Sequence, residues 1–511
     1  MIDNGAEQIW PLFEARVSAT PGALAVVDET GAELTWGQLS GRVAAIARGL
    51  ERMGVGRGST VSWQLPTCID AMTLALALCR LGVVQNPIIP MYQVRELRLV
   101  LSQVKPSLVF IDVDASGSPV HGPVQEALTG WSDGVIPRIV TLADLDLSEG
   151  DVPPPTPIHA GDRAWYCYTS GSTSAPKGAI HTDMAPLTAG RVFADAMELT
   201  PDDRYAIVFP FAHIGGMCNV VSSLVSGMVL YATRKFDPEV TIPALEEFGH
   251  TIAGAGPPFF SMYLEKQRQM PAGVSMAPTL RALAGGGAPT PPRLHTGFDE
   301  QPGSLPICIS YGLTEVPIAT AASPWDPLEV RSTTVGRPWR GMEIRVVDGD
   351  GNDVSIGVDG EVLLRGPQML LGYLDESLNA AAFTDGWFRT GDLGHLTGDG
   401  YLSIVGRIKD VIIRNMENIA PSEVEDLLIH HAKVREASVI GLPDERTGER
   451  VCAVVVPRDP SLTLVELTQW ARAEGLTPQK LPTQLELVDE LPLIGYGKVD
   501  KKALRDRFSG H

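Results

Sequence analysis

Residues 168–178 have the sequence Tyr-Thr-Ser-Gly-Ser-Thr-Ser-Ala-Pro-Lys-Gly and directly follow a strand-like run at 164–168. Glycines and small hydroxyl residues after a strand let backbone N–H groups approach an anion closely, and Lys177 adds a point charge. The stretch predicts a phosphate-binding loop, although the same residues also fit a flexible Ser/Gly turn. It is not a Walker A loop, which ends Gly-Lys-Ser/Thr, because here Lys177 precedes Gly178.

Strand and helix patterns alternate around this loop. We expect a hairpin over 23–28 and 33–35, strands over 60–64 and 107–111, and helices over 37–53, 69–81 and 94–103. Strands interleaved with helices predict α/β layers with a largely parallel sheet. Residues 114–157 are rich in Gly, Pro and Asp and predict surface loops around one short strand.

The composition limits the class of protein. Of 511 residues, 44% are hydrophobic and 20% charged, which is typical of a globular chain and excludes disorder. A net charge of −20 gives no electrostatic reason to bind nucleic acid. The acidic start and the short apolar stretch 71–84, which contains Arg80, predict no membrane span and a cytoplasmic location. The six separated cysteines are expected to be reduced core thiols.

A compact mixed module is predicted after Tyr401. Its first helix begins at Pro421, because proline suits the first helical position. Further expected elements are strands over 437–440 and 451–456, a helix over 464–475, and a last helix capped by Asp500. We therefore predict a large N-terminal domain of α/β layers over 1–406 and a smaller, mobile C-terminal α+β domain over 407–511.

More motifs follow in a fixed order. They are Ala284-Gly-Gly-Gly-Ala-Pro289, Tyr311-Gly-Leu-Thr-Glu315, Gly360-Glu361 with Arg365-Gly366, Trp387-Phe-Arg-Thr-Gly-Asp392, Gly406-Arg-Ile-Lys-Asp410 and Gly497-Lys-Val-Asp500. Each motif alone has a purely structural explanation, such as a core aromatic for Tyr311 or a turn residue for Asp392. In this order, over essentially the full length, they resemble the adenylate-forming superfamily, which contains acyl- and aryl-CoA ligases, carrier-protein adenylation domains and firefly luciferase.

The resemblance implies a nucleotide site. The residues that would hold the ATP phosphates are Thr169, Ser170, Gly171, Ser172, Thr173 and Lys177. Tyr311, followed by Gly312, matches the position whose ring stacks on adenine, and the wall beside the base would be Gly285, Gly286 and Gly287. Asp392 matches the carboxylate that accepts hydrogen bonds from the ribose hydroxyls. Arg407 matches an arginine that contacts the nucleotide.

The resemblance also implies catalytic residues. Thr314 and Glu315 match positions that bind phosphate and Mg²⁺, which suits a hydroxyl and a hard carboxylate oxygen. Lys498 matches the lysine that bridges the substrate carboxylate and the α-phosphate, where it neutralises charge. His213 matches an aromatic or histidine position beside the acyl pocket and thiol tunnel, although a satisfied core histidine is the alternative.

The implied activity is that of an acid–thiol ligase of the acyl-CoA synthetase type, which uses ATP, Mg²⁺ and CoA. A carboxylic acid would become an acyl adenylate; the small domain would then rotate about Lys409, and the CoA thiol would attack the adenylate. Segments 209–216, 257–260 and 285–287 contain no acidic residue, which favours an apolar acyl chain or ring over an amino acid. Asp237 is misplaced for binding an α-ammonium group.

One loop departs from the family pattern. Where Gly-Gly-Glu-Asn-Ile is usual, this chain has Asn-Met-Glu-Asn-Ile at 415–419. Asparagine tolerates the left-handed backbone region that glycine adopts freely, and methionine does so poorly. This departure leaves open a chain specialised in one half-reaction, including thioesterification of a supplied acyl adenylate. Apart from the loop, the sequence also leaves open a chain that loads the phosphopantetheine arm of a carrier protein.

Overall fold

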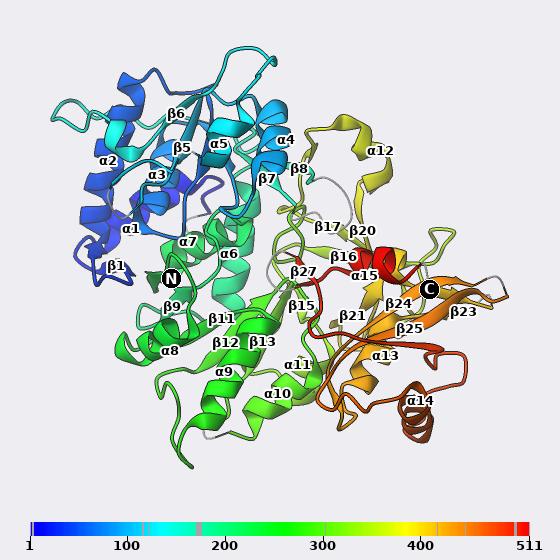
Figure 1. The fold of residues 1–511 in the computed structure, drawn as a ribbon. Coiled ribbons are helices and arrows are strands. Elements are labelled where there is room, and N and C mark those ends of the chain that lie inside the picture. Colours follow the sequence, from blue (N-terminus) through cyan, green and yellow to red (C-terminus); the bar gives the residue numbers. More distant parts are fainter. Residues whose placement is uncertain are drawn as a thin grey trace. The chain divides into compact units, whose positions relative to one another are not determined.

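The computed structural model describes residues 2, 5–114, 117–120, 122–169, 176–301, 303–415, 417–444, 446–494 and 498–509 (Figure 1). The chain divides into two compact units. Unit 1 comprises Met1–Thr169, Ala175–Glu343 and Arg365–Gly386, and unit 2 contains Ile344–Leu364 and Trp387–His511. Unit 2 thus includes residues on both sides of Arg407, and a mobile domain that begins at this residue stays a prediction.

The larger sheet of unit 1 has the strand order β15-β14-β13-β12-β11-β9-β10-β1-β2. The strands are β1 (Leu24–Asp28), β2 (Glu33–Thr35), β9 (Arg204–Ile207), β10 (Val229–Ala232), β11 (Ile252–Ala255), β12 (Ala282–Gly286), β13 (Ile307–Tyr311), β14 (Thr320–Ala321) and β15 (Arg337–Pro338). Strands β1 and β9 to β13 run parallel. The carboxyl ends of β9, β11, β12 and β13 therefore lie at one edge, where open α/β sheets bind ligands.

The second sheet of unit 1 has the order β18-β8-β7-β4-β3-β5-β6. Its strands are β3 (Thr60–Gln64), β4 (Val84–Pro87), β5 (Leu108–Ile111), β6 (Arg138–Val140), β7 (Trp165–Tyr168), β8 (Gly178–His181) and β18 (Gly372–Tyr373). Strands β7 and β8 pair antiparallel, with Tyr168 opposite Gly178. The predicted phosphate loop therefore connects two hydrogen-bonded neighbours.

Helices cover both faces of both sheets. One hydrophobic core joins the two sheets through α1 (Ile9–Ala19), α2 (Trp36–Arg52), α3 (Ile69–Arg80), α6 (Met184–Ala196) and α7 (Ile214–Ser226). The outer face of the larger sheet packs on α8 (Pro238–Glu247), α9 (Pro257–Gln269) and α10 (Pro292–Asp299), and that of the second sheet on α4 (Val94–Val104) and α5 (Gly122–Ala127). Alternate strand residues divide accordingly: Cys167 faces the shared core, and Tyr166 and Tyr168 face α4 and α5. The layers are helix, sheet, helix, sheet, helix. The connections of unit 1 also contain α11 (Leu328–Thr333), α12 (Asn379–Ala382) and β19 (Phe383–Thr384).

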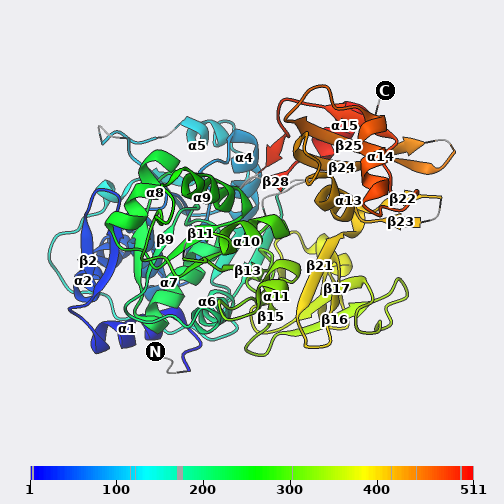
Figure 2. The same ribbon diagram turned by 90° about the horizontal axis from the view of Figure 1, so that it is seen from below.

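Unit 2 contains a small sheet and an α+β module. The small sheet contains β16 (Glu343–Val347), β17 (Gly360–Arg365), β20 (Trp387–Leu396) and β21 (Leu402–Arg407). A short 3₁₀ turn, Ile408–Asp410, leads into the module, whose strands are β22 (Ile412–Arg414), β23 (Glu417–Ile419), β24 (Val434–Asp444), β25 (Gly448–Pro457) and β26 (Gln484–Leu487). Helices α13 (Pro421–Leu428) and α14 (Leu464–Ala473) share one core with this sheet, and α15 (Lys501–Phe508) packs in a second (Figure 2). A hairpin of β27 (Leu493–Ile494) and β28 (Lys498–Val499) precedes α15.

Most of the expected elements are confirmed. The hairpin of β1 and β2 forms, α3 begins at Ile69, α13 begins at Pro421, and the Asp500 side chain accepts a hydrogen bond from the Ala503 N–H at the start of α15. The sequence interpretation missed α5, which lies in the region expected to form loops. All six cysteines are free and buried, as expected. Within the described residues, no helix is both long and apolar enough to cross a membrane.

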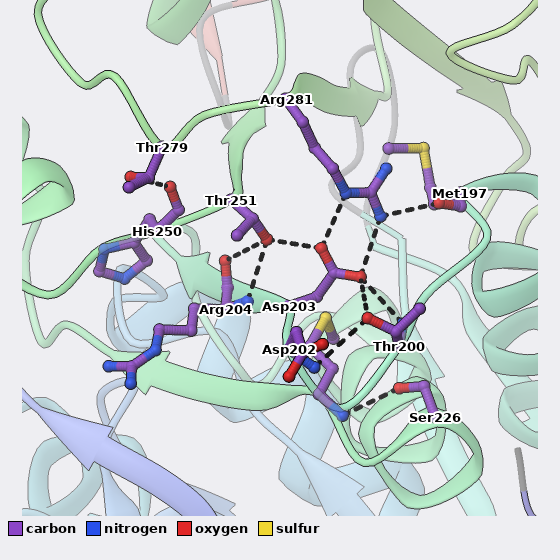
Figure 3. A network of polar contacts seen from close by, with 11 residues as sticks. Met197, Thr200, Asp202, Asp203, Arg204, Ser226, His250, Thr251, Thr279 and Arg281 are labelled. Atoms are coloured by element: carbon purple, nitrogen blue, oxygen red, sulfur yellow. Dashed lines mark hydrogen bonds and ion pairs between the residues drawn. The ribbon is translucent and has the colours of Figure 1, made fainter.

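A buried carboxylate fixes the edge of the larger sheet opposite the strand ends named above. Asp203 accepts hydrogen bonds from the Arg281 Nε at 2.8 Å and from the Thr251 hydroxyl at 2.6 Å (Figure 3). Asp203 directly precedes β9, Arg281 directly precedes β12, and Thr251 directly precedes β11. Burial raises the pKa of Asp203, but the bonds from Arg281, Thr251 and the Thr200 backbone outweigh it, so the pKa is below its ordinary value. The ion pair stabilises the fold above about pH 4 and loses that effect as Asp203 is protonated at lower pH.

Replacing Arg281 by leucine is expected to lower the free energy of unfolding by about 3 kcal/mol at pH 7, because it leaves the Asp203 charge buried without its cation. The urea midpoint followed by tryptophan fluorescence measures this loss. Arg42→Leu is the matched control, because Arg42 pairs with Asp70 at the surface and such pairs contribute less than about 1 kcal/mol. Equal midpoints for the two variants would contradict the structural role of Arg281.

Candidate active site

The carboxyl ends of the parallel strands in unit 1 bring several predicted site residues to one edge. Tyr311 ends β13, the glycines from Gly285 to Gly287 end and follow β12, and Pro257 begins α9 just after β11. The segment after β9 leads to His213, which caps α7. Phe260 is fully buried in the core, whereas Pro257, Pro258 and Phe259 are partly exposed.

The glycines of β12 are required by the neighbouring strands. A Cβ atom on Gly285 would lie 2.2 Å from the Ala255 carbonyl oxygen, and one on Gly286 would lie 2.1 Å from the Ser310 carbonyl oxygen. These distances are far shorter than any real contact, so β11, β12 and β13 can pack at this spacing only around glycine. The additional role of the glycines as a wall beside the adenine base stays a prediction.

Three hydrogen bonds between described residues lie at the base of the predicted phosphate loop. The Thr169 N–H donates to the Lys177 carbonyl at 3.0 Å, and the Lys177 N–H donates to the Thr169 hydroxyl oxygen at 3.1 Å. The Tyr92 hydroxyl donates to the Thr169 carbonyl at 3.0 Å. The other predicted phosphate ligands, Ser170, Gly171, Ser172 and Thr173, lie outside the described residues.

Thr314 and Glu315 are tied to β8 and β18, the strands beside the phosphate loop. The His181 Nε2 lies 2.8 Å from the Thr314 carbonyl oxygen, and since a carbonyl only accepts, Nε2 carries the proton. Burial lowers the pKa of His181 to about 4, which keeps the ring neutral. The Tyr373 hydroxyl donates to the Glu315 carboxylate at 2.7 Å. The sequence interpretation missed His181 and Tyr373, because neither lies inside a motif that we had singled out.

The donor set around Glu315 fits Mg²⁺ delivered with ATP. Among the described residues, no group of three or more His, Cys, Asp or Glu side chains could hold a metal ion by itself. Mg²⁺ is usually bound through one or two carboxylates together with substrate phosphates, so a single glutamate is sufficient. Lys177, near the end of the predicted phosphate loop, contacts the same Tyr373 ring, with its ammonium nitrogen 5.5 Å from the ring centroid.

His213 is a neutral hydrogen-bond donor. Its Nδ1 accepts a hydrogen bond from the Gly215 N–H at 3.2 Å, so the neutral ring carries its proton on Nε2. Burial lowers the pKa of His213 to about 4. The ring can therefore donate one hydrogen bond at neutral pH, and it does not supply a positive charge.

A small apolar cavity lies behind His213 in unit 1. Its volume is about 10 Å³, close to the space of one water molecule, and its lining includes Trp63, Trp165, Cys167, Phe211 and Met217. Burial raises the pKa of the Cys167 thiol to about 12, so Cys167 is a core residue, as expected. The cavity is too small for an acyl group and does not represent the acyl pocket.

In unit 2 the two residues predicted to bind the nucleoside are cross-strand partners. Asp392 on β20 lies opposite Arg407 on β21, and the Arg407 Nε is 2.9 Å from an Asp392 carboxylate oxygen. Asp392 is buried, and its backbone N–H donates to the Thr390 hydroxyl oxygen at 2.9 Å. The buried Asp392 carboxylate therefore has its charge balanced by Arg407.

Lys498 belongs to a cationic group in the same unit. Burial and the nearby charges of Arg407 and Lys409 lower its pKa to about 8, against the smaller opposing effect of Asp392 and Asp410. Burial and Arg407 also lower the pKa of Lys409, which lies in the 3₁₀ turn. Lys498, Lys409 and Arg407 are thus close enough to affect one another's charge, with Asp392 and Asp410 beside them.

Comparisons with known proteins agree with this geometry. The model of the AMP-binding enzyme family matches residues 13–374, and that of the AMP-binding enzyme C-terminal domain matches residues 423–498. The chain is 33% identical over 496 residues to indoleacetate–CoA ligase of Aromatoleum aromaticum, covering 93% of each chain. It is 32% identical over 510 residues to feruloyl-CoA synthase of Amycolatopsis, covering 98% of each. ATP-bound MatB from Rhodopseudomonas palustris superposes with a TM-score of 0.86 at 26% identity, covering 98% of both chains.

The chain belongs to the AMP-binding enzyme family. It is an acid–thiol ligase of the acyl- or aryl-CoA ligase branch, and the ligases of this branch form an acyl adenylate and use ATP, Mg²⁺ and CoA. The expected adenylate-forming fold, with its large N-terminal and smaller C-terminal parts, is confirmed. The individual site residues stay predictions.

The unusual turn of this family member has a local structural reason. Arg414 and Glu417 are paired at the end of the β22–β23 hairpin. Asn415, which follows β22, has φ +53°, a left-handed conformation that asparagine tolerates. Asparagine thus replaces glycine here without disrupting the hairpin. Met416 lies outside the described residues.

The depressed pKa of Lys498 predicts a pH dependence of the ligase. In the role predicted for Lys498 the cationic lysine is the active form, so adenylate formation is expected to fall as pH rises through about 8, to roughly one tenth of its plateau a pH unit above that. ATP–pyrophosphate exchange between pH 6 and pH 10 measures the profile. Lys498→Arg should retain a low rate without this step, because arginine stays charged; a step of equal size in that variant would assign the titration to another group.

Proposed function

We propose that this ligase joins an apolar carboxylic acid, aliphatic or aromatic, to CoA. Lys177 and Glu315 in unit 1 hold the phosphates and Mg²⁺, and the bound Mg²⁺ would neutralise phosphate charge. Asp392 and Arg407 bind the nucleoside, and Lys498 stabilises charge as the acid attacks the α-phosphate. Residues from Arg407 onward rotate about Lys409 between the two half-reactions; the single 3₁₀ turn between β21 and β22 supports a hinge there.

The observation that carries the choice of acid is the position of Asp237. Its side chain accepts the Glu239 N–H at 3.0 Å and caps α8, so this carboxylate has a structural role and is not reserved for a substrate ammonium group. The segments after β9, β11 and β12 otherwise present aromatic, proline and glycine residues together with His213. An amino-acid substrate would leave its ammonium charge without a partner among these segments, which is costly.

A thermal-shift screen of acids and their acyl-sulfamoyl-adenosine mimics tests this proposal. Suitable acids are indoleacetate, ferulate, a medium-chain fatty acid, sulfoacetate and phenylalanine, since relatives act on several of these. The adenylate mimic of an apolar acid is expected to raise the melting temperature far more than the free acid, because it resembles the reaction intermediate.

Mass analysis after incubation with ATP, the best acid and either CoA or a holo-carrier protein identifies the acceptor. We expect acyl-CoA and no acylated carrier. A preference for the phenylalanine mimic would contradict the choice of acid, and acylation of the carrier alone would contradict CoA as the acceptor.

A further inference from the structure

The carboxylate of Glu315 is nearly removed from solvent and needs a hydrogen-bond partner. Glu315 is 8% exposed, and its Oε1 accepts the 2.7 Å hydrogen bond from the Tyr373 hydroxyl. A buried carboxylate without a donor is costly, so this bond restricts the rotamer of Glu315.

The backbone around Tyr373 is fixed from two directions. The Leu374 N–H donates to the Gly178 carbonyl at 2.8 Å, and β18 pairs antiparallel with β8 at Ala179 and Ile180. Three residues before Tyr373, the Leu370 N–H donates to the Glu315 carbonyl at 2.9 Å. The short segment 370–374 is thus bonded to the strand that follows the phosphate loop and to the backbone of Glu315.

The same aromatic ring contacts a cation. The Lys177 ammonium lies 5.5 Å from the centroid of the Tyr373 ring, within the range of a cation–π interaction. Lys177 immediately precedes Gly178, the residue bonded to Leu374. The Tyr373 side chain therefore contacts both Glu315, which is assigned to Mg²⁺, and Lys177, which is assigned to the nucleotide phosphates.

We propose that Tyr373 is a positioning residue that sets the Glu315 carboxylate for Mg²⁺ through its hydroxyl and the Lys177 ammonium for phosphate through its ring. This role rests on the proposed function, because it takes Glu315 as the metal ligand and Lys177 as the phosphate ligand. Tyr373 itself contacts neither substrate nor metal in this role. Partners that orient a metal ligand in this way typically change metal affinity about 10- to 100-fold when they are removed.

Calorimetric titration of the full-length chain with ATP at a series of Mg²⁺ concentrations, without acid, tests the hydroxyl. Tyr373→Phe keeps the ring and is expected to need about tenfold more Mg²⁺ for half-maximal ATP binding, with unchanged affinity for ATP in EDTA. Tyr263→Phe is the matched control, because the Tyr263 hydroxyl is equally buried and has no partner among the described residues. Wild-type Mg²⁺ dependence in Tyr373→Phe would overturn the proposal.

A double-mutant cycle tests whether the Tyr373 hydroxyl acts through Glu315, and a leucine variant tests the role of the ring. Glu315→Gln should raise the Mg²⁺ requirement, and Tyr373→Phe should add nothing in that background, because the hydroxyl acts through Glu315. Tyr373→Leu should additionally weaken ATP binding in EDTA about two- to fivefold through loss of the ring. Additive effects of Glu315→Gln and Tyr373→Phe would overturn the positioning role alone. ATP binding by the wild-type chain that does not depend on Mg²⁺ would overturn the proposed function as well.

Discussion

Lys498→Ala is expected to reduce adenylate formation from ATP and acid about 10²- to 10³-fold, because one preorganised charge at the transition state is lost. Thioester formation from a supplied acyl adenylate should be nearly unchanged, because we assign Lys498 to the first half-reaction only. Pyrophosphate exchange measures the first rate, and acyl-CoA release from synthetic acyl adenylate measures the second. The pKa of about 8 places the native lysine in its cationic form at neutral pH, so the variant removes a real charge.

Lys480→Ala is the control for this experiment. Lys480 is a lysine of the same unit that pairs with Glu423 at 2.6 Å and has no assigned role in the reaction. It should leave both half-reactions unchanged. Equal losses of both half-reactions in Lys498→Ala would mean that this residue supports the fold or the nucleotide in general, and the assignment to adenylation would fall.

The fold was predictable where the local sequence carries its own stop and start signals. Pro421 and Asp500 mark helix starts through backbone chemistry that needs no tertiary partner, and both positions are confirmed. Helix α5 was not predictable in this way, because Gly122–Ala127 is short and surrounded by loop-forming residues. Its stability comes from Val124 and Ala127, which pack into the core beneath α4, and that contact is invisible in a local pattern.

The site was predictable only as far as motifs extend. The motifs name Glu315 and Lys177, yet the residue that contacts both is Tyr373, which lies 58 positions after Glu315. Such a contact depends on β18 joining the edge of β8, a pairing of distant segments that periodicity cannot reveal. The glycines at 285 and 286 show the opposite case: the motif is visible, but the clash that requires it comes from adjacent strands.

Asp392→Asn is expected to weaken binding of both ATP and the acyl-adenylate mimic about 10- to 100-fold, since a hydrogen bond to a charged group is lost at the ribose. Asparagine keeps the shape of the side chain but replaces one acceptor with a donor that would face the ribose hydroxyls. It also removes the ion pair with Arg407, so the arginine loses the partner that orients it. Because the nucleoside is present in both half-reactions, both should slow, in contrast to Lys498→Ala.

The effect of Asp392→Asn must be separated from general damage to the sheet that carries it. Glu361→Gln serves this purpose: Glu361 is a similarly buried carboxylate on β17 that pairs with Arg389 on β20. Both variants lose one carboxylate–guanidinium pair from the same sheet, so their melting temperatures should fall by comparable amounts. Calorimetric dissociation constants should rise for Asp392→Asn alone; if they rise equally in both variants, Asp392 contributes to the sheet and not to the ribose site.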